Sequence, residues 1–139
     1  MSTKIPCYCG TLRQATRTLT NMYDAHLTSA GIRSTQFTIL QALGSRDAAR
    51  IRDLEDILAI DQTTLTRSLA LLARRGLVTV VGHPSGREKN WGLTAKGKTT
   101  LTDAKPLWEA AQGEVRKLLG TDRTRALHDD VFRLVERLS

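Results

Sequence analysis

Nine side chains in the middle of the chain have the chemistry of DNA contacts. They are Gln62, Thr63, Thr64, Thr66, Arg67, Arg74, Arg75, Arg87 and Lys89. Amide, hydroxyl and guanidinium groups near the start of a helix can reach base edges in the major groove. The two arginines at 74 and 75 are better placed for phosphates, and the last two basic residues suit a narrow minor groove, whose negative potential attracts them. The set predicts a surface that binds double-stranded DNA.

Cys7 and Cys9 are the second set with distinctive chemistry. Pro6 favours extended backbone before it, so we expect both cysteines where an extended arm becomes a helix. Residues two apart in an extended segment point to the same face, which would let both thiols bind one soft ion. The helix N-terminus and nearby Lys4 favour the thiolate form. Two interpretations stay open: small structural thiols, or a sensor of oxidants or of a thiophilic metal or metalloid.

The remaining residues with catalytic or metal-binding chemistry form no constellation. His26, His83 and His128 are far apart and lack the spacing of a zinc site. Trp91 and Trp108 are expected to pack in the core, with Trp108 a candidate for the lining of a small-molecule pocket. The sequence has no phosphate-binding glycine loop, zinc-protease signature or nucleophile elbow. We therefore expect no enzyme and no required cofactor.

Positive charge is concentrated around the candidate DNA contacts. The chain has 139 residues and a formal net charge of +7. Residues 61–100 hold seven basic and two acidic side chains, whereas residues 101–139 hold seven of each. Such a local excess is typical of a phosphate-binding surface, although a solvated basic face without a partner has the same composition. Aromatic residues make up only 4%, which disfavours stacking platforms for single-stranded nucleic acid.

Composition also bears on where the protein works. Hydrophobic residues make up 40% and charged residues 25%, which is ordinary globular usage. No apolar run approaches the roughly 18 residues of a membrane span, and the first six residues lack the apolar core of a secretion signal. We expect a cytoplasmic protein of one domain, or of one domain with a docking extension, with reduced cysteines.

The spacing of apolar residues predicts the elements that position these side chains. Residues 10–28 follow a helical period, and Ala30 and Gly31 are expected to end that helix. Ser34 can cap a second helix, which Gly44 would stop. The buried positions of this helix and of a short third one are Phe37, Leu40, Leu43, Ile51, Leu54, Ile57 and Leu58.

The DNA-contacting stretch is predicted to be a helix followed by a hairpin. Asp61 is expected to cap a helix that runs to Arg75, with Gly76 after it. The buried face of this helix consists of Leu65, Leu69 and Leu72. The β-branched run 77–81 predicts a strand, turn residues follow, and residues 88–93 can return as its partner.

Two more helices are predicted after the hairpin. Thr94 can cap the first, and Pro106 inside it is expected to produce a kink. Gly120 separates the two helices, and Thr121 can cap the last one. Leucines and valines of the first and last helices form the apolar stripes Leu12, Leu19, Leu127, Val131, Leu134 and Leu138. A single small domain cannot cover them, which predicts a two-fold dimer.

Two short helices, a polar-faced helix and a basic hairpin together predict a winged helix-turn-helix, mostly α with a small β-hairpin wing. From about residue 9 to its end, the chain resembles the MarR-type (multiple antibiotic resistance regulator) transcription factors. The matching stretches are Thr35-Gln36-Phe37, Leu65-Thr66-Arg67, Leu72-Ala73-Arg74-Arg75-Gly76-Leu77-Val78 and Leu93-Thr94-Ala95-Lys96-Gly97. We expect an N-terminal arm and dimerisation helix at 1–33, a DNA-binding lobe at 34–94 and C-terminal dimerisation helices at 95–139.

The resemblance implies a homodimer in which the first helix and the last two helices of each chain interdigitate. It also implies that the helix at 61–75 reads the major groove and that Arg87 enters the minor groove. The family often has an acidic residue two places before the wing arginine, and this sequence has Ser85 there. The resemblance therefore predicts the groove that Arg87 enters but not the orientation of its side chain.

We expect a dimeric repressor that binds a pseudo-palindromic operator and is released by a small inducer. The inducer would be a thiophilic metal, a metalloid or an oxidant sensed by Cys7 and Cys9. One alternative keeps the DNA binding and places a small lipophilic or aromatic ligand in a pocket between the lobes. A second alternative, from another class, is a basic helical module that docks an acidic protein.

Overall fold

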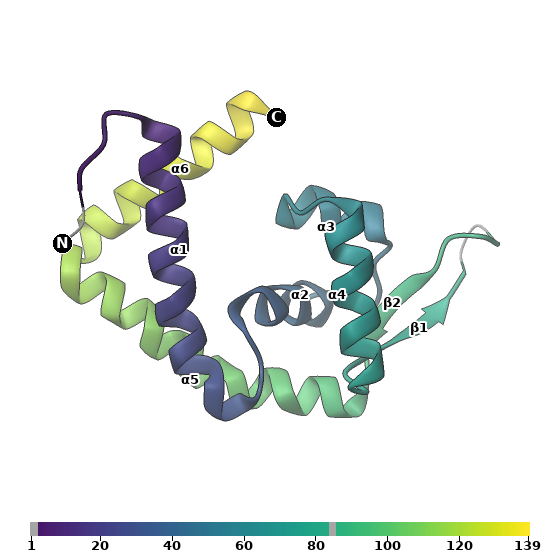
Figure 1. Ribbon diagram of the computed structural model, residues 1–139. Coiled ribbons are helices and arrows are strands. Elements are labelled where there is room, and N and C mark those ends of the chain that lie inside the picture. Colours follow the sequence, from purple (N-terminus) through teal and green to yellow (C-terminus); the bar gives the residue numbers. More distant parts are fainter. Residues whose placement is uncertain (1–2, 84–85) are drawn as a thin grey trace.

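The computed structural model describes residues 3–83 and 86–139, and in these ranges it is mostly helical with one β-hairpin (Figure 1). The elements in chain order are α1 Tyr8–Leu27, the short 3₁₀ helix η1 Thr28–Ala30, α2 Ser34–Gly44, α3 Ile51–Leu58, α4 Gln62–Arg74, β1 Val78–Gly82, β2 Asn90–Leu93, α5 Ala95–Leu119 and α6 Thr121–Leu138. The expected fold class is confirmed.

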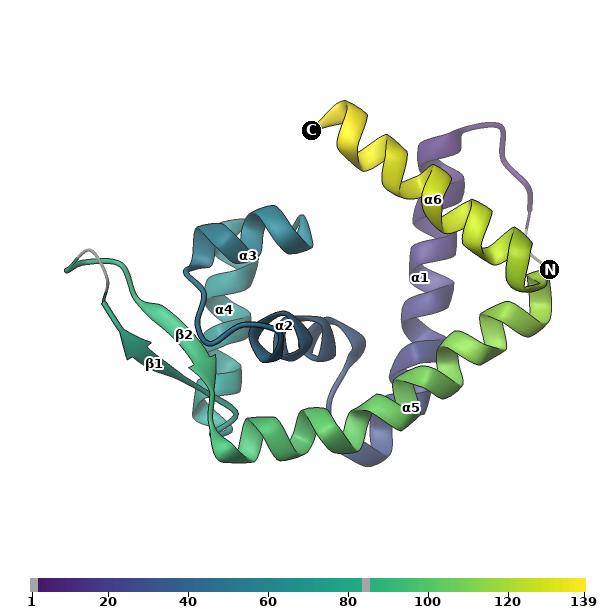
Figure 2. The same cartoon turned by 180° about the vertical axis from the view of Figure 1, so that it is seen from behind.

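The elements form two arms that share α5 (Figures 1 and 2). One arm holds α2, α3, α4 and the hairpin, and the other holds α1 and α6. α5 starts beside the hairpin, runs past α2 and continues into the second arm. The described strands of the hairpin project away from the helices.

The hydrophobic core lies in the first arm and is closed by α5. Leu65, Leu69 and Leu72 are fully buried, which confirms the predicted inner face of α4. Leu54 is the buried residue of α3, whereas Ile57 is 49% exposed and not in the core as its spacing predicted. The reason is the length of α3, because a helix of eight residues presents little more than one row of side chains to a neighbour.

The hairpin is fixed to the helices at its base. Its strands pair antiparallel, with Val78 opposite Leu93, Thr79 opposite Gly92 and Val80 opposite Trp91. Ala49 forms two further backbone hydrogen bonds with Trp91, at 3.0 and 2.8 Å, which join the segment before α3 to β2. Of the predicted turn, Pro84 and Ser85 lie outside the described residues, and so does the departure from the family pattern at Ser85.

The ends of α2 differ from the prediction. The N-cap is Arg33, and Ser34 is the first helical residue. Gly44 ends the helix without the left-handed conformation that a stopping glycine adopts. A Cβ at Gly44 would lie 2.6 Å from the side chain of Leu101. The glycine therefore serves the close approach of α2 to α5, and not the end of the helix.

α5 and α6 follow the prediction more closely. Thr94 caps α5, since its hydroxyl oxygen accepts a hydrogen bond of 2.9 Å from the Gly97 amide. α5 continues through Pro106 as one helix and is bent along its length (Figure 2). The cap of α6 differs by one residue from the prediction. Thr121, which was predicted as the N-cap, is the first helical residue, and Gly120 is the N-cap. No helix in the described ranges is long and apolar enough to cross a membrane.

Candidate nucleic-acid interface

α4 begins at a carboxylate cap, as predicted. The two carboxylate oxygens of Asp61 accept hydrogen bonds from the Thr64 amide at 3.0 Å and from the Thr64 hydroxyl at 2.6 Å. These hydrogen bonds lower the pKa of Asp61 from its ordinary value, and the negative charge is favourable at a helix N-terminus. The hydroxyl proton of Thr64 is therefore donated to the cap and not to an outside acceptor.

The outer face of α4 is polar and accessible. The predicted DNA contacts Gln62, Thr63, Thr66, Arg67 and Arg74 are all exposed. Thr63, Arg67 and Arg74 lie opposite the three buried leucines, as the helical period requires. Gln62 and Thr66 lie on the flank of the helix, between its buried and its outer face. An exposed helix with such side chains has the dimensions and the donors that the major groove accepts.

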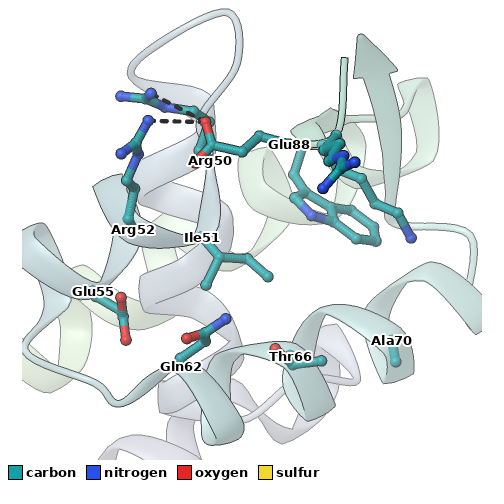
Figure 3. Close-up of a pocket in the computed structure, with 11 residues that line it drawn as sticks. Arg50, Ile51, Arg52, Glu55, Gln62, Thr66, Ala70 and Glu88 are labelled. Carbon is teal, nitrogen blue, oxygen red and sulfur yellow. Dashed lines mark hydrogen bonds and ion pairs between the residues drawn. The ribbon is translucent and has the colours of Figure 1, made fainter. Parts of the chain in front are cut away.

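A groove of about 610 Å³ separates α4 from the hairpin, with the start of α3 as its third wall (Figure 3). Gln62 and Thr66 line it from α4, and Arg87 and Lys89 line it from the hairpin. The structure thus brings four of the nine predicted contacts to one groove. Arg67 lies outside its lining, on the exposed surface of α4.

The α3 wall carries charged side chains that the sequence did not single out. Arg50 donates from Nε and Nη2 to the two carboxylate oxygens of Asp53, at 2.9 and 3.0 Å. These hydrogen bonds lower the pKa of Asp53 to about 2. Glu88 of the hairpin accepts from Arg52 at 2.9 Å and from Arg50 at 3.3 Å. The capping box of Arg50 and Asp53 could have been predicted from their spacing of three residues in the sequence. The contacts of both arginines with Glu88 could not, because they join segments that are far apart in the sequence.

Arg75 lies apart from this groove. Its guanidinium donates to the Gly31 carbonyl at 2.6 Å and to the Gln36 side chain at 3.5 Å. Its own carbonyl oxygen accepts a hydrogen bond of 2.9 Å from Lys96. Arg75 was predicted to contact phosphate. In the structure its guanidinium donates hydrogen bonds to the protein and fixes the end of α4 to the turn before α2 and to α2.

The cysteines lie at the start of α1, and both are exposed free thiols. Cys7 is the extended N-cap residue, and its Sγ accepts from the Gly10 amide at 3.3 Å. Cys9 is in the first helical turn, and its Sγ accepts from Arg13 at 3.5 Å. Because Cys9 is helical, the two thiols do not share an extended segment, and joint binding of one ion within a chain requires the first turn to unwind. No group of three or more metal-ligating side chains occurs in the described ranges.

Trp108 and His26 form contacts between helices. The Trp108 ring stacks on Phe37, with 5.5 Å between the ring centroids, and joins α5 to α2. His26 Nε2 lies 2.7 Å from Glu114 Oε2 and joins α1 to α5. The hollow between α1, α2 and the end of α4 has a polar lining that consists largely of Asn21, Asp24, Thr28, Arg33, Gln36 and Arg75.

Comparisons with known proteins show the same fold. The sequence profile of the MarR family matches residues 27–87. The crystal structure of the M. tuberculosis transcriptional regulator MosR in complex with DNA is 34% identical, with a TM-score of 0.83 over 95% of this chain and 98% of that chain. A mutant MarR from E. coli complexed with operator DNA is 21% identical, with a TM-score of 0.82 over 89% and 90% of the two chains.

The transcriptional repressor CouR bound to p-coumaroyl-CoA is 22% identical, with a TM-score of 0.85 over 96% of this chain and 98% of that chain. No curated protein sequence matches the chain.

Proposed function

The chain belongs to the MarR family of DNA-binding transcriptional regulators, and from this premise we propose that it is a homodimeric repressor that an inducer releases from a pseudo-palindromic operator. The observation that carries the DNA-binding mode is the groove between the polar face of α4 and the basic hairpin. No residue is assigned a catalytic role.

In the proposed complex, α4 lies in the major groove and the hairpin reaches the adjacent minor groove. The residues assigned to base edges are Gln62, Thr63, Thr66 and Arg67. Arg74 is assigned to phosphate, and Arg87 and Lys89 to the minor groove. MosR and the E. coli MarR mutant were solved with DNA, which supports this docking for a chain of the same fold.

We assign dimerisation to α1, α5 and α6. The large apolar side chains of α6 are exposed in the single chain, namely Leu127, Phe132, Leu134, Val135 and Leu138. A hollow of about 460 Å³ between these three helices is lined by Leu19 of α1 and Val131 of α6. A second copy that covers these faces across a two-fold axis is the commonest solution for such a surface. The division into 1–33, 34–94 and 95–139 follows from this assignment.

We propose Cys7 and Cys9 as the sensor of the inducer, a thiophilic metal, a metalloid or an oxidant. Both thiols are exposed, and Cys7 is also the cap of α1. Ligation or oxidation of Cys7 removes its hydrogen bond to the helix and disturbs the start of a dimerisation helix. A shift of α1 changes the spacing of the two α4 helices in a dimer, which disfavours operator binding.

The alternative inducer is a small lipophilic or aromatic ligand between the lobes. CouR was solved with p-coumaroyl-CoA, which supports this alternative. Against it, Trp108 is stacked on Phe37, and the hollow between α1, α2 and α4 has a polar lining. The remaining alternative is a module whose basic face docks an acidic protein.

A salt titration with duplex DNA tests the proposed function. Binding through phosphates weakens steeply as salt rises, and a repressor keeps a preference for its operator over random duplex. Footprinting on the DNA upstream of its own gene supplies the operator. A chain that binds no duplex at low salt, or that binds all sequences equally, is not the repressor proposed here.

A further inference from the structure

The groove beside α4 indicates where the DNA backbone runs. In B-DNA one sugar–phosphate strand separates the major groove from the neighbouring minor groove. With α4 in the first groove and the hairpin in the second, that strand passes between the two elements. The space between them is the groove of about 610 Å³, so the side chains of its third wall, at the start of α3, face phosphates.

Two arginines stand on that wall, and their contacts differ. Arg50 uses Nε and Nη2 for Asp53 and Nη1 for Glu88. Its three nitrogens are thus committed to carboxylates of the protein. Arg52 makes one such contact, from Nη2 to Glu88, and its side chain is 60% exposed. Arg52 is therefore the arginine with donors available to a ligand in the groove.

Figure 3 shows Arg50, Arg52 and Glu88 together on one side of the groove, with Gln62 and Thr66 of α4 on the other. Glu88 places a carboxylate beside the path of a polyanion. Its charge is balanced in the free protein by the two arginines at 2.9 and 3.3 Å. A phosphate that enters the groove competes with this carboxylate for the Arg52 guanidinium, since both are anions that the planar fork binds.

We propose that Arg52 binds a phosphate of the strand that separates the two DNA grooves, and that Glu88 is the counter-ion with which this phosphate competes. The proposal rests on the proposed docking of α4 and the hairpin. It adds α3 to the DNA-binding surface. It also predicts that loss of the Arg52 charge lowers the affinity for DNA and that loss of the Glu88 charge raises it.

The test uses the full chain and a fluorescein-labelled random duplex of about 30 base pairs, long enough for two half-sites one helical turn apart. Affinity is measured across a salt series for the wild type, Arg52→Ala, Arg52→Lys and Glu88→Gln. Lys105→Ala, on the exposed surface of α5, removes one positive charge away from the groove and is the matched control. Circular dichroism melts establish that each variant is folded.

Arg52→Ala is expected to lower the affinity for random duplex by roughly threefold to tenfold and to reduce the salt slope by about one. Arg52→Lys is expected to keep the slope, because it keeps the charge. Glu88→Gln is expected to raise the affinity, and Lys105→Ala to leave it unchanged.

Wild-type affinity and slope in a folded Arg52→Ala variant would overturn the phosphate assignment. A loss of affinity in Glu88→Gln would overturn the competition. Absence of duplex binding by the wild type would instead remove the proposed function itself, so the two failures are distinguishable.

Discussion

The guanidinium of Arg75 donates a hydrogen bond of 2.6 Å to the carbonyl oxygen of Gly31, which joins the end of α4 to the turn after α1. The carbonyl oxygen of Arg75 accepts from Lys96 at 2.9 Å, which joins the same point to α5. Thr94 adds a hydrogen bond of 2.6 Å to the Gly76 carbonyl. The end of α4 is thus held by the turn after η1 on one side and by the start of α5 on the other.

Arg74 and Arg75 are neighbours that we expect to behave differently on substitution. Arg75→Ala removes hydrogen bonds within the protein and is expected to lower the free energy of unfolding by about 1–2 kcal/mol. Arg74→Ala removes an exposed side chain and is expected to leave stability within about 0.5 kcal/mol. It should instead weaken DNA binding and reduce the salt slope by about one.

Urea unfolding at one fixed protein concentration, together with duplex titration, measures both effects. The concentration is fixed because the stability of a dimer depends on it. Equal stability of the two variants would show that the contact of Arg75 with Gly31 does not contribute to holding α4.

Gly97 marks a close approach of α5 to the backbone of Leu77. A Cβ on Gly97 would lie 2.0 Å from the carbonyl oxygen of Leu77, which is backbone and cannot move aside. Gly97→Ala is therefore expected to destabilise the protein by about 2–3 kcal/mol. Gly113→Ala, in the same helix, is the control, because a Cβ there lies 3.8 Å from its nearest neighbour, an arginine side chain.

Thermal and urea unfolding compare the two glycine variants. Gly113→Ala is expected to keep or raise stability, by up to about 1 kcal/mol, since alanine is the better helix former. Unfolding of both variants like the wild type would contradict the close contact between Gly97 and the carbonyl oxygen of Leu77.

The elements of this fold were predictable because their signals are local. The Asp61 and Thr94 caps and the buried leucines of α4 follow from hydrogen-bonding type and helical period. The matching stretches around Arg75 and around Gly97 were recognisable only as sequence patterns. The structure shows that they pack on each other, and this contact between segments has no local signature.

The candidate site was predictable on α4 and on the hairpin but not on α3. Base-reading side chains stand out because polar residues occupy the outer face of a helix with a buried inner face. Arg52 and Glu88 are 36 residues apart, and neither an arginine nor a glutamate is by itself an unusual residue on a protein surface. The protein partners of Arg75 were not predictable either, because a basic residue at a helix end looks the same whether its partner is a phosphate or the protein.

The exposed leucines of α6 carry the prediction of a dimer. Leu127 and Leu134 are seven residues apart and lie on the same face of the helix, about half exposed in the single chain. Leu134→Glu places a charge in the proposed interface and is expected to shift the protein toward the monomer. Light scattering at micromolar concentration should give twice the mass of one chain for the wild type and for Glu136→Gln, an exposed control in the same helix. A monomeric wild type would contradict the assembly.

Arg67 and Arg87 test the assignment of the two DNA grooves. Arg67 is exposed on the second turn of α4, where it can contact a guanine edge through two hydrogen bonds. Arg67→Ala is expected to cost roughly 1–3 kcal/mol of operator affinity and to relax preference at one base pair per half-site. Arg87→Ala is expected to weaken binding with a smaller change in preference, concentrated where the minor groove is narrow. Titration of operator variants measures both, and wild-type affinity in both variants would remove the groove assignment.

Cys7 and Cys9 test the proposed inducer. Cys7 accepts the Gly10 amide as the cap of α1, and Cys9 lies in the turn that this cap begins. Capture of one soft ion by both thiols requires this turn to open, so binding at the thiols is coupled to the start of a dimerisation helix. Soft thiophiles such as trivalent arsenic, antimony or copper(I) are selected over hard cations, and peroxide reacts with the thiolate form.

The experiment measures operator release by arsenite, antimonite, copper(I) and peroxide in the wild type and in the Cys7→Ser/Cys9→Ser double variant. Serine is a favoured N-cap residue, so the double variant keeps the cap and its fold while losing both sulfur atoms. We expect at least one of these agents to release the wild type, and the double variant to stay on the operator at the same concentration. Magnesium, a hard cation, is the control and should release neither protein. Release of the double variant at wild-type concentrations of every agent would make the thiols structural and place the inducer in a pocket between the lobes.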